Sequence, residues 1–592
     1  MDVHTQERSI EDLRIALQGR RSPAAQQLRL AIEATPRQPA ETLRLAVLLQ
    51  QDPLFAPYGL QLEAANSRTS AREFILLGKH AEALEAAQKA LTLFQRASDN
   101  CPSPLAVRKL PEELGRTQSV AGEAYHGQQQ WAEAQRTYES AFAHFAASGL
   151  LKSFLPETLG RYAEACARQV PPSKTRGVAL SPSCLEWLRR FVQLEGQSSP
   201  KAQAIAKHVA LKALGDLRPP ASARTPAPSA ALDTQAFAQA MDLYRARKFE
   251  QASSAFQALP ETYPTSPHVL RSRYWRGRSL AQSKKPKEAK QVFQALVEDA
   301  PLTYYGLLAA LASGEDLQAR IASLTPKAST RDPVLTQCEF TRVERAEHFL
   351  SEGMGTSAAE ELQGLATREV ARFGSSFLLY LAMLHSEAGD DPVTFLAVSE
   401  LLRRKHPSAL TPFTLRLLFP PRHLELVQKY ATEHQLEPAL VLSVMKQESS
   451  FRPTAVSDQG AVGLMQLLPS TAEEMEKGIG KQLSQVEPNI RVGTKYLRKL
   501  LNHFCGNRAL ALAGYNAGMR KVANWRKQGL VQDELIDFIE ALPVRETRDY
   551  VSQIIRNHYW YSSRVIDTKP LPMEHFWSSG ASAKTQKGRC PP

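Results

Sequence analysis

The sequence lacks any long hydrophobic run. A membrane-spanning helix needs about 20 consecutive apolar residues. The two most apolar stretches, 302–312 and 377–384, are shorter than this and are interpreted as core helices. The opening residues, MDVHTQERSIEDLR, are polar and contain no basic segment followed by an apolar one, so no secretory signal is visible. This indicates a cytosolic chain, or one whose signal has been removed or lies upstream.

Cysteine is scarce, and the basic residues form no dense block. The six cysteines are scattered without CxxC spacing, which argues against a structural zinc site and neither requires nor excludes a disulfide. The formal net charge of +13 suits an anionic partner. However, the lysines and arginines are not interleaved with aromatics, and no nucleic-acid-binding motif is present. A solvated basic surface is the alternative explanation of the charge.

What the sequence does contain is helical periodicity. Its 592 residues are too many for one hydrophobic core, so several domains are expected. Hydrophobic residues make up 43% and charged residues 22% of the chain, as is usual for a globular protein. Long amphipathic patterns fill the sequence and period-2 alternation is scarce, which predicts an all-α fold.

One spacing of small and large apolar residues recurs four times, each time after a turn-like stretch. Small residues at its second position let two helices approach closely, and large ones at the third fill the groove between them. The copies are His80, Ala83, Ala87, Ala90; Trp131, Ala134, Tyr138, Ala141; Phe249, Ala252, Phe256, Leu259; and Pro286, Ala289, Phe293, Leu296. This pattern resembles the second helix of a tetratricopeptide-type hairpin, and the last two copies begin 37 residues apart, close to that period. Ordinary helical hairpins without a peptide-binding groove are the alternative.

Composition suggests how the chain is divided. A stretch rich in Pro, Ala and Ser cannot sustain a helix and is interpreted as a linker, FPPRH (419–423) marks a second boundary, and the end of the chain is poor in apolar residues. We therefore predict an N-terminal helical-repeat array (1–216), a linker (217–233), a second array (234–418), a C-terminal domain (422–567) and a disordered tail (568–592).

The stretch VLSVMKQESS, residues 441–450, places a carboxylate on an apolar helix face. Val441, Val444 and Met445 fall at i, i+3 and i+4, and Glu448 takes the next place on that face. A carboxyl group there, at the edge of a cleft, is partly desolvated, which disfavours its charged form and should raise its pKa. Such a group can act as a general acid. A solvated surface charge, the usual role of a helical glutamate, does not fit the apolar stripe.

Three further motifs follow, SDQGAVGLMQLLPSTA (457–472), ALAGYNAGMRKVANW (511–525) and FIEALPVRETRDYV (538–551). In the first, two glycines allow a tight turn with positive φ, and Met465 and Gln466 offer an apolar surface and an amide. Such a loop suits a sugar carrying N-acetyl groups. In the second, Tyr515 and Asn516 end a helical run and can present a phenol and an amide to a cleft. In the third, Pro543 opens a helix.

The series ES, GLMQ, YNAG and ETRxYV, in this order and spacing, resembles the catalytic domain of the soluble lytic transglycosylases, lysozyme-like enzymes of bacterial cell-wall turnover. The resemblance is strong over 422–567. It is weaker upstream, where large members of that family carry a superhelical all-α array and where PLTYYGLLAA (301–310) resembles one of their segments. Two local departures are Gly514, where alanine often precedes the Tyr–Asn pair, and Val462 in the glycine loop.

The resemblance implies a reaction without metal or cofactor. Glu448 would protonate the oxygen between N-acetylmuramic acid and N-acetylglucosamine in peptidoglycan. It would then take the proton of the muramyl C6 hydroxyl, which closes on C1 and leaves a 1,6-anhydromuramyl end. The resemblance also implies an envelope location, and the helical arrays would curve around a glycan strand or hold partner enzymes.

Site roles carry over motif by motif. Ser457, Met465 and Gln466 would line the sugar subsites, Tyr515 would place its hydroxyl near Glu448, Asn516 would support the loop, and Glu546 and Glu540 would contact the glycan or the loop. Surface charge or ion pairing is the alternative for the last two glutamates. Asp458, the other carboxylate before the GLMQ loop, fits a turn former better than a second catalytic group.

Two other functions remain open. A goose-type lysozyme would use the same fold and the same glutamate but would add a positioned water. A helical-repeat scaffold with a non-catalytic lysozyme-like domain is the second, and the intact Glu448 and Tyr515 argue against it.

Overall fold

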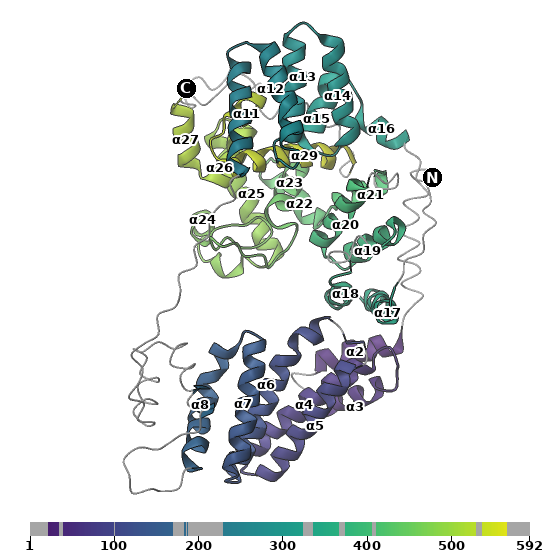
Figure 1. Ribbon diagram of the computed structural model, residues 1–592, viewed down its shortest axis with the longest axis vertical. Coiled ribbons are helices and arrows are strands. Elements are labelled where there is room, and N and C mark those ends of the chain that lie inside the picture. The colour runs from purple at the N-terminus through teal and green to yellow at the C-terminus, as the bar shows by residue number, and fades with distance from the viewer. Residues whose placement is uncertain are drawn as a thin grey trace. The chain divides into compact units, whose positions relative to one another are not determined.

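The computed structural model describes residues 22–34, 39–99, 101–102, 104–169, 183–184, 186–187, 229–323, 335–365, 373–404, 410–528 and 535–564. The secondary structure of these residues is helical, with two isolated β-bridges in the loop around 456–467 and no strand, which confirms the all-α prediction (Figure 1). No described helix is both long enough and apolar enough to traverse a bilayer.

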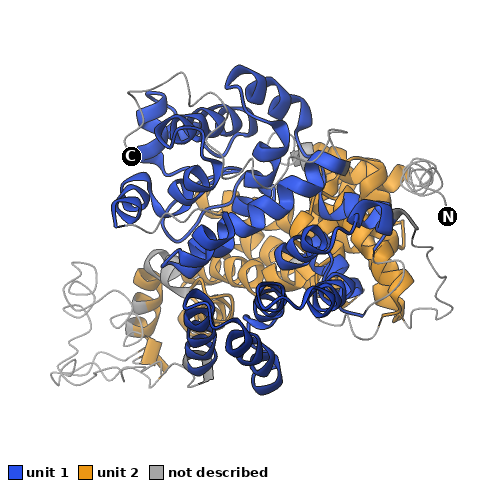
Figure 2. Ribbon diagram, turned by 90° about the horizontal axis from the view of Figure 1, so that it is seen from above, with its two compact units in different colours: residues 1–7, 224–329, 394–592 blue, residues 8–223, 330–393 orange. Residues whose placement is uncertain are grey.

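The chain folds into two compact units, each described by itself (Figure 2). The first comprises 1–7, 224–329 and 394–592, and the second comprises 8–223 and 330–393. The predicted second array, 234–418, is thus divided between the two units, and the other predicted domain boundaries stay predictions. Helix α11 begins at Ser229, so the last residues of the predicted linker are helical. The rest of the linker (217–228) and the predicted tail (568–592) lie outside the described residues.

The helices of the second unit are α2 (Pro23–Ala34), α3 (Pro39–Leu49), α4 (Ala56–Leu76), α5 (His80–Asp99), α6 (Pro104–Gly127), α7 (Trp131–Ala147), α8 (Leu151–Arg168), α17 (Gln337–Ser351), α18 (Gly355–Leu362) and α19 (Ser375–Glu387). The helices of the first unit begin with α11 (Ser229–Arg245), α12 (Phe249–Thr262), α13 (Val269–Gln282), α14 (Pro286–Asp299), α15 (Tyr304–Ser313) and α16 (Leu317–Ser323).

The first unit continues with α20 (Asp391–Arg403), whose first turn belongs to the second unit, and α21 (Pro412–Leu418), α22 (Leu424–Glu433), α23 (Pro438–Ser449), α24 (Pro469–Met475), the 3-10 helix η3 (Gly480–Gln482), α25 (Val486–His503), α26 (Arg508–Ala517), α27 (Met519–Lys527), α28 (Leu535–Ala541) and α29 (Arg545–Arg564).

The recurring spacing marks real helix starts. Helices α5, α7, α12 and α14 begin at the first residue of the four copies. In each case the residue two places earlier has a left-handed backbone, with φ of 71° at Gly78, 59° at Gln129, 57° at Arg247 and 61° at Lys284. This conformation ends the preceding helix and turns the chain into the next one. The hairpin prediction is therefore confirmed at the level of local structure.

Close helix approach explains the aromatic third position of two copies. A Cβ added to Gly122 of α6 would lie 2.7 Å from the ring of Tyr138, and one added to Gly277 of α13 would lie 2.4 Å from the ring of Phe293. Since real Cβ contacts are never this short, each ring occupies the space that a side chain on the facing helix would need. The glycine and the aromatic ring together fix how closely the two helices of each hairpin pack.

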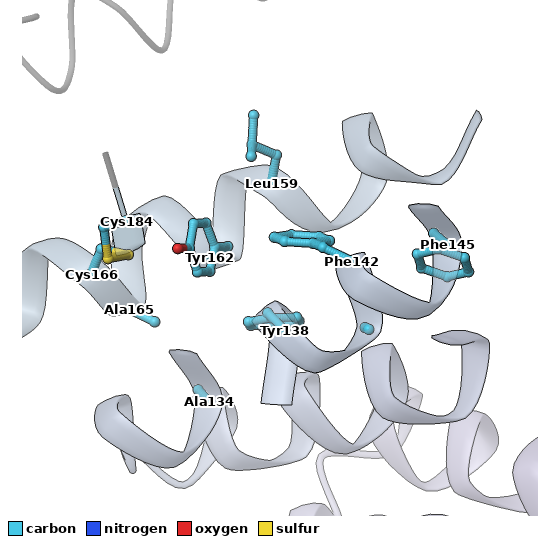
Figure 3. Packing of buried hydrophobic residues seen from close by; sticks show 10 residues of the cluster. Ala134, Tyr138, Phe142, Phe145, Leu159, Tyr162, Ala165, Cys166 and Cys184 are labelled. Carbon is cyan, nitrogen blue, oxygen red and sulfur yellow. A yellow bond between two sulfur atoms is a disulfide. The ribbon is translucent and has the colours of Figure 1, made fainter. Parts of the chain in front are cut away.

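A disulfide lies at one end of the hydrophobic core that α7 and α8 form. Buried residues of the two helices, among them Tyr138, Phe142 and Tyr162, form one apolar cluster, and Cys166 at its end is bonded to Cys184 (Figure 3). The sequence left open whether disulfides form. The cross-link closes a separation of 18 residues and restricts the unfolded chain there.

The candidate site rests on two packed helices of the first unit, α23 and α29. Glu437, the residue before α23, pairs with His558 at 2.8 Å, whereas Glu448 in the last turn of α23 is bonded to Tyr550. The later residue of α23 therefore meets the earlier residue of α29, so the two helices run antiparallel. The end of α23 that carries the carboxylate lies against the beginning of α29.

Candidate active site

Glu448 lies where α23 ends. The helix opens with Pro438 at its first position and buries Val441, Val444 and Met445 completely, as the apolar stripe predicted. It ends because Ser450 and Phe451 both take left-handed backbones, with φ of 50° and 63°, without a glycine. Such conformations are uncommon for residues with a side chain and occur where the surrounding structure imposes them.

Glu448 is half-buried, and its carboxyl group is strongly desolvated. Its desolvation raises the pKa to about 7 from an ordinary value of 4.5. The hydroxyl of Tyr550, which donates to Oε1 at 2.5 Å, lowers this pKa, and the negative charge of Glu546 raises it. Desolvation dominates, so the predicted upward shift is confirmed. The group is poised to hold or release a proton near neutral pH.

Tyr550 is the tyrosine hydrogen-bonded to the glutamate, and the predicted position of Tyr515 near Glu448 agrees with the structure although its hydroxyl bonds elsewhere. The hydroxyl of Tyr515 donates to the backbone carbonyl of Met465 at 2.8 Å instead. Tyr515 still lies close to the glutamate, because burial and then the charge of Glu448 raise its pKa. The signal for Tyr550 was present in the ETRxYV motif, but spacing alone does not tell which of two tyrosines reaches the carboxylate.

An asparagine missed by the sequence reasoning holds the glycine loop. Asn489 of α25 is fully buried, and its Nδ2 donates to the carbonyls of Val462 at 2.9 Å and Leu483 at 2.8 Å. Its Oδ1 accepts the backbone N–H of Met465 at 2.8 Å. One amide thus satisfies three backbone groups of a loop that has no strand to do so. The available signal was a polar residue on the apolar face of an amphipathic helix, as at Glu448.

We predict that Gly463→Ala dismantles this loop. Gly463 has φ of 83°, and an added Cβ would lie 2.2 Å from both Asn489 Nδ2 and the Leu483 carbonyl oxygen. Strain and displacement of the Asn489 bonds should cost about 2 kcal/mol or more in free energy of unfolding, measured by urea denaturation. The matched control is Gly460→Ala, since Gly460 has φ of 77° but open space around its Cβ position. Equal losses in both variants would contradict the role given to the Asn489 contact.

The GLMQ segment is tied to α23 through its backbone. Ser449 Oγ donates to the carbonyl of Leu464 at 2.9 Å. The side chain of Met465 is fully buried against Gly493. Met465 therefore does not line an open sugar subsite, which corrects that prediction: the buried thioether packs the core, and the backbone of the residue carries the contacts to Asn489 and Tyr515.

Two predicted subsite residues keep accessible side chains. Gln466, with φ of 45°, is half-buried and donates through Nε2 to the carbonyls of Ala455 at 3.0 Å and Gly463 at 2.9 Å. Ser457 is exposed, and its Oγ accepts the backbone N–H of Ala461 at 3.0 Å. Both residues therefore shape the loop, and contact of either with a sugar stays a prediction.

Asn516 joins the end of α26 to the start of α29. Its Oδ1 accepts from Thr547 Oγ1 at 2.7 Å, and its Nδ2 donates to Glu546 Oε1 at 3.3 Å. This fits the supporting role predicted for Asn516. Glu546 is exposed, so it is free to meet a ligand, and its charge acts on Glu448. Gly514, two residues before Asn516, is explained by Phe504, whose ring would lie 2.8 Å from an added Cβ.

Glu540 is buried inside the protein and paired with an arginine, so the prediction that it contacts the glycan is corrected. Its side chain is 1% exposed and forms an ion pair with Arg271 of α13. It also accepts hydrogen bonds from Trp275 Nε1 and from the hydroxyl of Tyr305, each at 3.0 Å. With all these donors in place the carboxylate has no access to a ligand, and it instead joins α28 to the hairpin helices of the same unit.

Comparison with known proteins agrees with the motifs. Residues 425–535 match the family model of the transglycosylase SLT domain, and 271–303, which cover most of α13 and α14, match a tetratricopeptide repeat. The chain is 31% identical over 167 residues to the soluble lytic murein transglycosylase of Salmonella typhimurium. This alignment covers 27% of this chain and 26% of that protein. It is 36% identical over 140 residues to the membrane-bound lytic murein transglycosylase F of Desulfosudis oleivorans, 22% of this chain and 30% of the relative.

The chain thus spans about a quarter of the length of the curated relatives it matches. Among solved structures, the lytic transglycosylase Slt of Pseudomonas aeruginosa, an inactive mutant, aligns over 98% of this chain and 92% of its own, with 20% identity and a TM-score of 0.47. The site geometry and the matched domain coincide, since Glu448, the GLMQ loop and the YNAG motif all lie within 425–535. The chain therefore carries a transglycosylase SLT domain, which confirms the resemblance to the soluble lytic transglycosylases that its motifs indicated.

Proposed function

We propose that this protein is a peptidoglycan lytic transglycosylase, which cleaves the β-1,4 bond between N-acetylmuramic acid and N-acetylglucosamine without water and leaves a 1,6-anhydromuramyl end. The observation that carries the proposal is the Glu448 carboxyl group, which lies within the segment that matches the SLT domain, is desolvated to a pKa of about 7 and is oriented by Tyr550. The relatives named as murein transglycosylases support the choice of substrate.

In this proposal Glu448 has two successive roles. Because Oε1 accepts from the Tyr550 hydroxyl, the acid proton sits on Oε2, which donates it to the glycosidic oxygen as the bond to the muramyl C1 breaks. The group is then a carboxylate and takes the proton of the muramyl C6 hydroxyl, whose oxygen forms a new bond to C1. One proton enters the leaving sugar and one returns to Glu448, so the residue ends the cycle in its starting state.

A second carboxylate is not needed for this sequence of steps. Glycosidases with two carboxylates use the second one as a nucleophile or as the base for a water molecule. Here the attacking hydroxyl belongs to the same sugar, and such intramolecular attack has a high effective molarity. Among the described residues, Glu546 is the carboxylate whose charge acts on Glu448, and its hydrogen-bond partner is Asn516.

The remaining site roles are part of the proposal. Ser457, Gln466 and Asn516 would contact the acetamido and hydroxyl groups of the glycan, and Glu546 would meet it at the start of α29. The net charge of +13 suits a substrate whose peptide stems carry carboxylates. Since this substrate lies outside the cytoplasmic membrane, we propose an envelope location, with the helical arrays holding the glycan or partner enzymes.

Digestion of purified sacculi tests the proposal directly. The soluble products are separated and weighed by mass spectrometry. Anhydromuramyl ends, lighter by one water than reducing ends, are expected from the unchanged protein. Reducing ends would instead identify a goose-type lysozyme, and no release of fragments would indicate a non-catalytic scaffold.

The pH dependence of cleavage should respond in opposite directions to two substitutions. The first step needs protonated Glu448, so activity should decline as the pH rises through about 7. Glu546→Gln removes a charge that raises the pKa of Glu448, and the decline should move to lower pH. Tyr550→Phe removes a hydrogen bond that lowers this pKa, and the decline should move to higher pH. The measurement is kcat/KM on a soluble glycan substrate between pH 5 and 9.

Asp458→Asn is the matched control for that pair. Asp458 is an exposed carboxylate of the same domain and does not act on Glu448, so its removal should leave the position of the decline unchanged. A shift of both test variants in the same direction would show that the profile reports another group.

A further inference from the structure

A cavity of about 380 Å³ is lined in part by residues near the end of α23 that flank Glu448 in the sequence, and it has no part in the mechanism above. Lys446, Gln447 and Ser450 of the catalytic segment form one side of it, and Arg556 and Asn557 of α29 form another. The remaining wall is largely apolar and comes from α20, the end of α21 and the residues before α15. All of these elements belong to the first unit.

Arg556 brings a desolvated positive charge to this cavity. Burial lowers the pKa of its guanidinium to about 10. Its Nε and Nη2 donate to Asn557 Oδ1 at 3.2 and 2.6 Å, and within the described part of the chain it forms no ion pair with a carboxylate. Buried arginines are normally paired with an acid, because an unpaired charge in a desolvated place is costly. Among the described residues the charge therefore has no counterion.

Asn557 adds an unused donor at the same place. The residue is 0% exposed, its Oδ1 accepts from Arg556, and its Nδ2 has no hydrogen-bond acceptor in the part of the chain that the structure describes. Buried polar groups are nearly always bonded, so an orphaned donor that lines a cavity indicates a missing acceptor. Because the guanidinium fixes the amide through Oδ1, the amide cannot turn to present its oxygen instead.

The rest of the lining completes an anion site with an apolar wall. The ammonium of Lys446 lies 3.0 Å from the ring centroid of Phe395 and 5.3 Å from that of Phe419. Leu302, Leu402 and Leu418 are the aliphatic members, and no aspartate or glutamate lines the cavity. Two cations and one orphaned amide thus surround a volume that would hold a small ligand.

We propose that this cavity binds the carboxylate of a small organic acid that carries an apolar substituent. A planar group with two oxygens can accept from the guanidinium and from Asn557 Nδ2 together, while its substituent packs on Phe395 and the leucines. A doubly charged, strongly hydrated phosphate fits the apolar wall less well. The carboxylate can come from a peptide stem of the glycan, an assignment that rests on the proposed function, or from a free short peptide.

The test is calorimetric titration of the full chain carrying Glu448→Gln with acetyl-D-alanyl-D-alanine, with the C-terminal amide of the same dipeptide, and with inorganic phosphate. The acid should bind at least tenfold more tightly than the amide or phosphate. Equal affinity for acid and amide, or tighter binding of phosphate, would overturn the proposal. The titrations use the Glu448→Gln variant, so they do not depend on glycan cleavage. A negative titration therefore does not contradict the proposed function, and a negative sacculus digest does not contradict the binding site.

Matched variants locate the binding. Arg556→Met keeps the length of the side chain and removes a desolvated charge, so it should fold and lose at least tenfold in affinity. Arg545→Met changes an exposed arginine of the same helix that is paired with Asp549 at 3.4 Å, and it should bind as before. Asn557→Leu removes the orphaned donor and should also weaken binding of the acid. It provides the test if Arg556→Met proves unstable. Unchanged affinity in both pocket variants would overturn the site.

Two glycan fragments distinguish the sources of the carboxylate. A muramyl disaccharide with its peptide stem should bind more tightly than the same disaccharide without it, and this gain should disappear in Arg556→Met if the stem is the occupant. If the gain persists in Arg556→Met while the free dipeptide still depends on Arg556, the pocket serves a free carboxylate.

Discussion

Glu448→Gln is expected to lower the rate of glycan cleavage by about a thousandfold or more. General acid–base catalysis by one positioned group contributes about 10²–10⁴-fold, and here the same carboxyl group serves both the protonation and the deprotonation step. Glutamine has the same shape and can still accept the hydrogen bond of Tyr550, so substrate binding should be retained. The measurement is the rate of fragment release from sacculi at pH 6.

The same substitution should make the protein more stable at alkaline pH. Glu448 has a folded-state pKa of about 7 against an ordinary 4.5. In the unfolded chain it ionises from about pH 4.5 upward, whereas the folded protein holds the proton until about 7. The native protein therefore loses stability between these values, up to about 3 kcal/mol. Glutamine escapes this loss.

Urea unfolding at pH 5 and pH 8 checks that expectation. The advantage of Glu448→Gln should be small at pH 5 and close to its full value at pH 8. Glu474→Gln, a change at an exposed site of the same domain, serves as the control and should show no such trend. An equal advantage at both pH values would mean that the carboxyl group is not desolvated in the native protein.

Arg271→Leu is expected to destabilise the first unit by about 3–5 kcal/mol. Both side chains of the Arg271–Glu540 pair are nearly inaccessible, at 8% and 1% exposure. Removing the arginine leaves Glu540 with the neutral donors Trp275 and Tyr305 as hydrogen-bond partners and with the charge of Arg548 acting on it. An uncompensated buried charge is far more costly than the absence of the whole pair.

The double variant Arg271→Leu with Glu540→Leu separates these two effects. Replacing both partners removes the unpaired charge, so most of the lost stability should return. Replacing the exposed pair Arg545 and Asp549 in the same two ways should change the free energy of unfolding by less than about 1 kcal/mol. If the double variant is no more stable than Arg271→Leu, the loss comes from packing and not from charge.

Local features of the fold could be predicted from the sequence. The repeated spacing located the first residues of α5, α7, α12 and α14, because helix starts depend on a turn and on the apolar period that follows it. The raised pKa of Glu448 was predictable for the same reason: a carboxylate at i+7 of an apolar stripe is desolvated wherever that stripe is buried.

The partners of these residues were not predictable, because they are distant in sequence. Tyr550 lies 102 residues from Glu448 and Arg271 lies 269 residues from Glu540. No periodicity connects residues so far apart. Met465 was misplaced for a related reason, since an apolar residue in a loop motif can face either a ligand or the core, and only the neighbouring Gly493 decides which.

The contacts of Glu540 with Arg271, Trp275 and Tyr305 also bear on whether the C-terminal domain is structurally independent. The catalytic carboxylate, the glycine loop and Tyr550 all come from one segment, which suggests a cassette that recombination could move between proteins. Yet the counterion of Glu540 and both of its neutral donors come from α13 and the start of α15, far upstream in the sequence. A transplanted cassette would leave Glu540 without the ion pair and the two hydrogen bonds that it has in this protein. The C-terminal segment and the helical hairpins of the first unit therefore depend on each other structurally, although they lie far apart in the sequence.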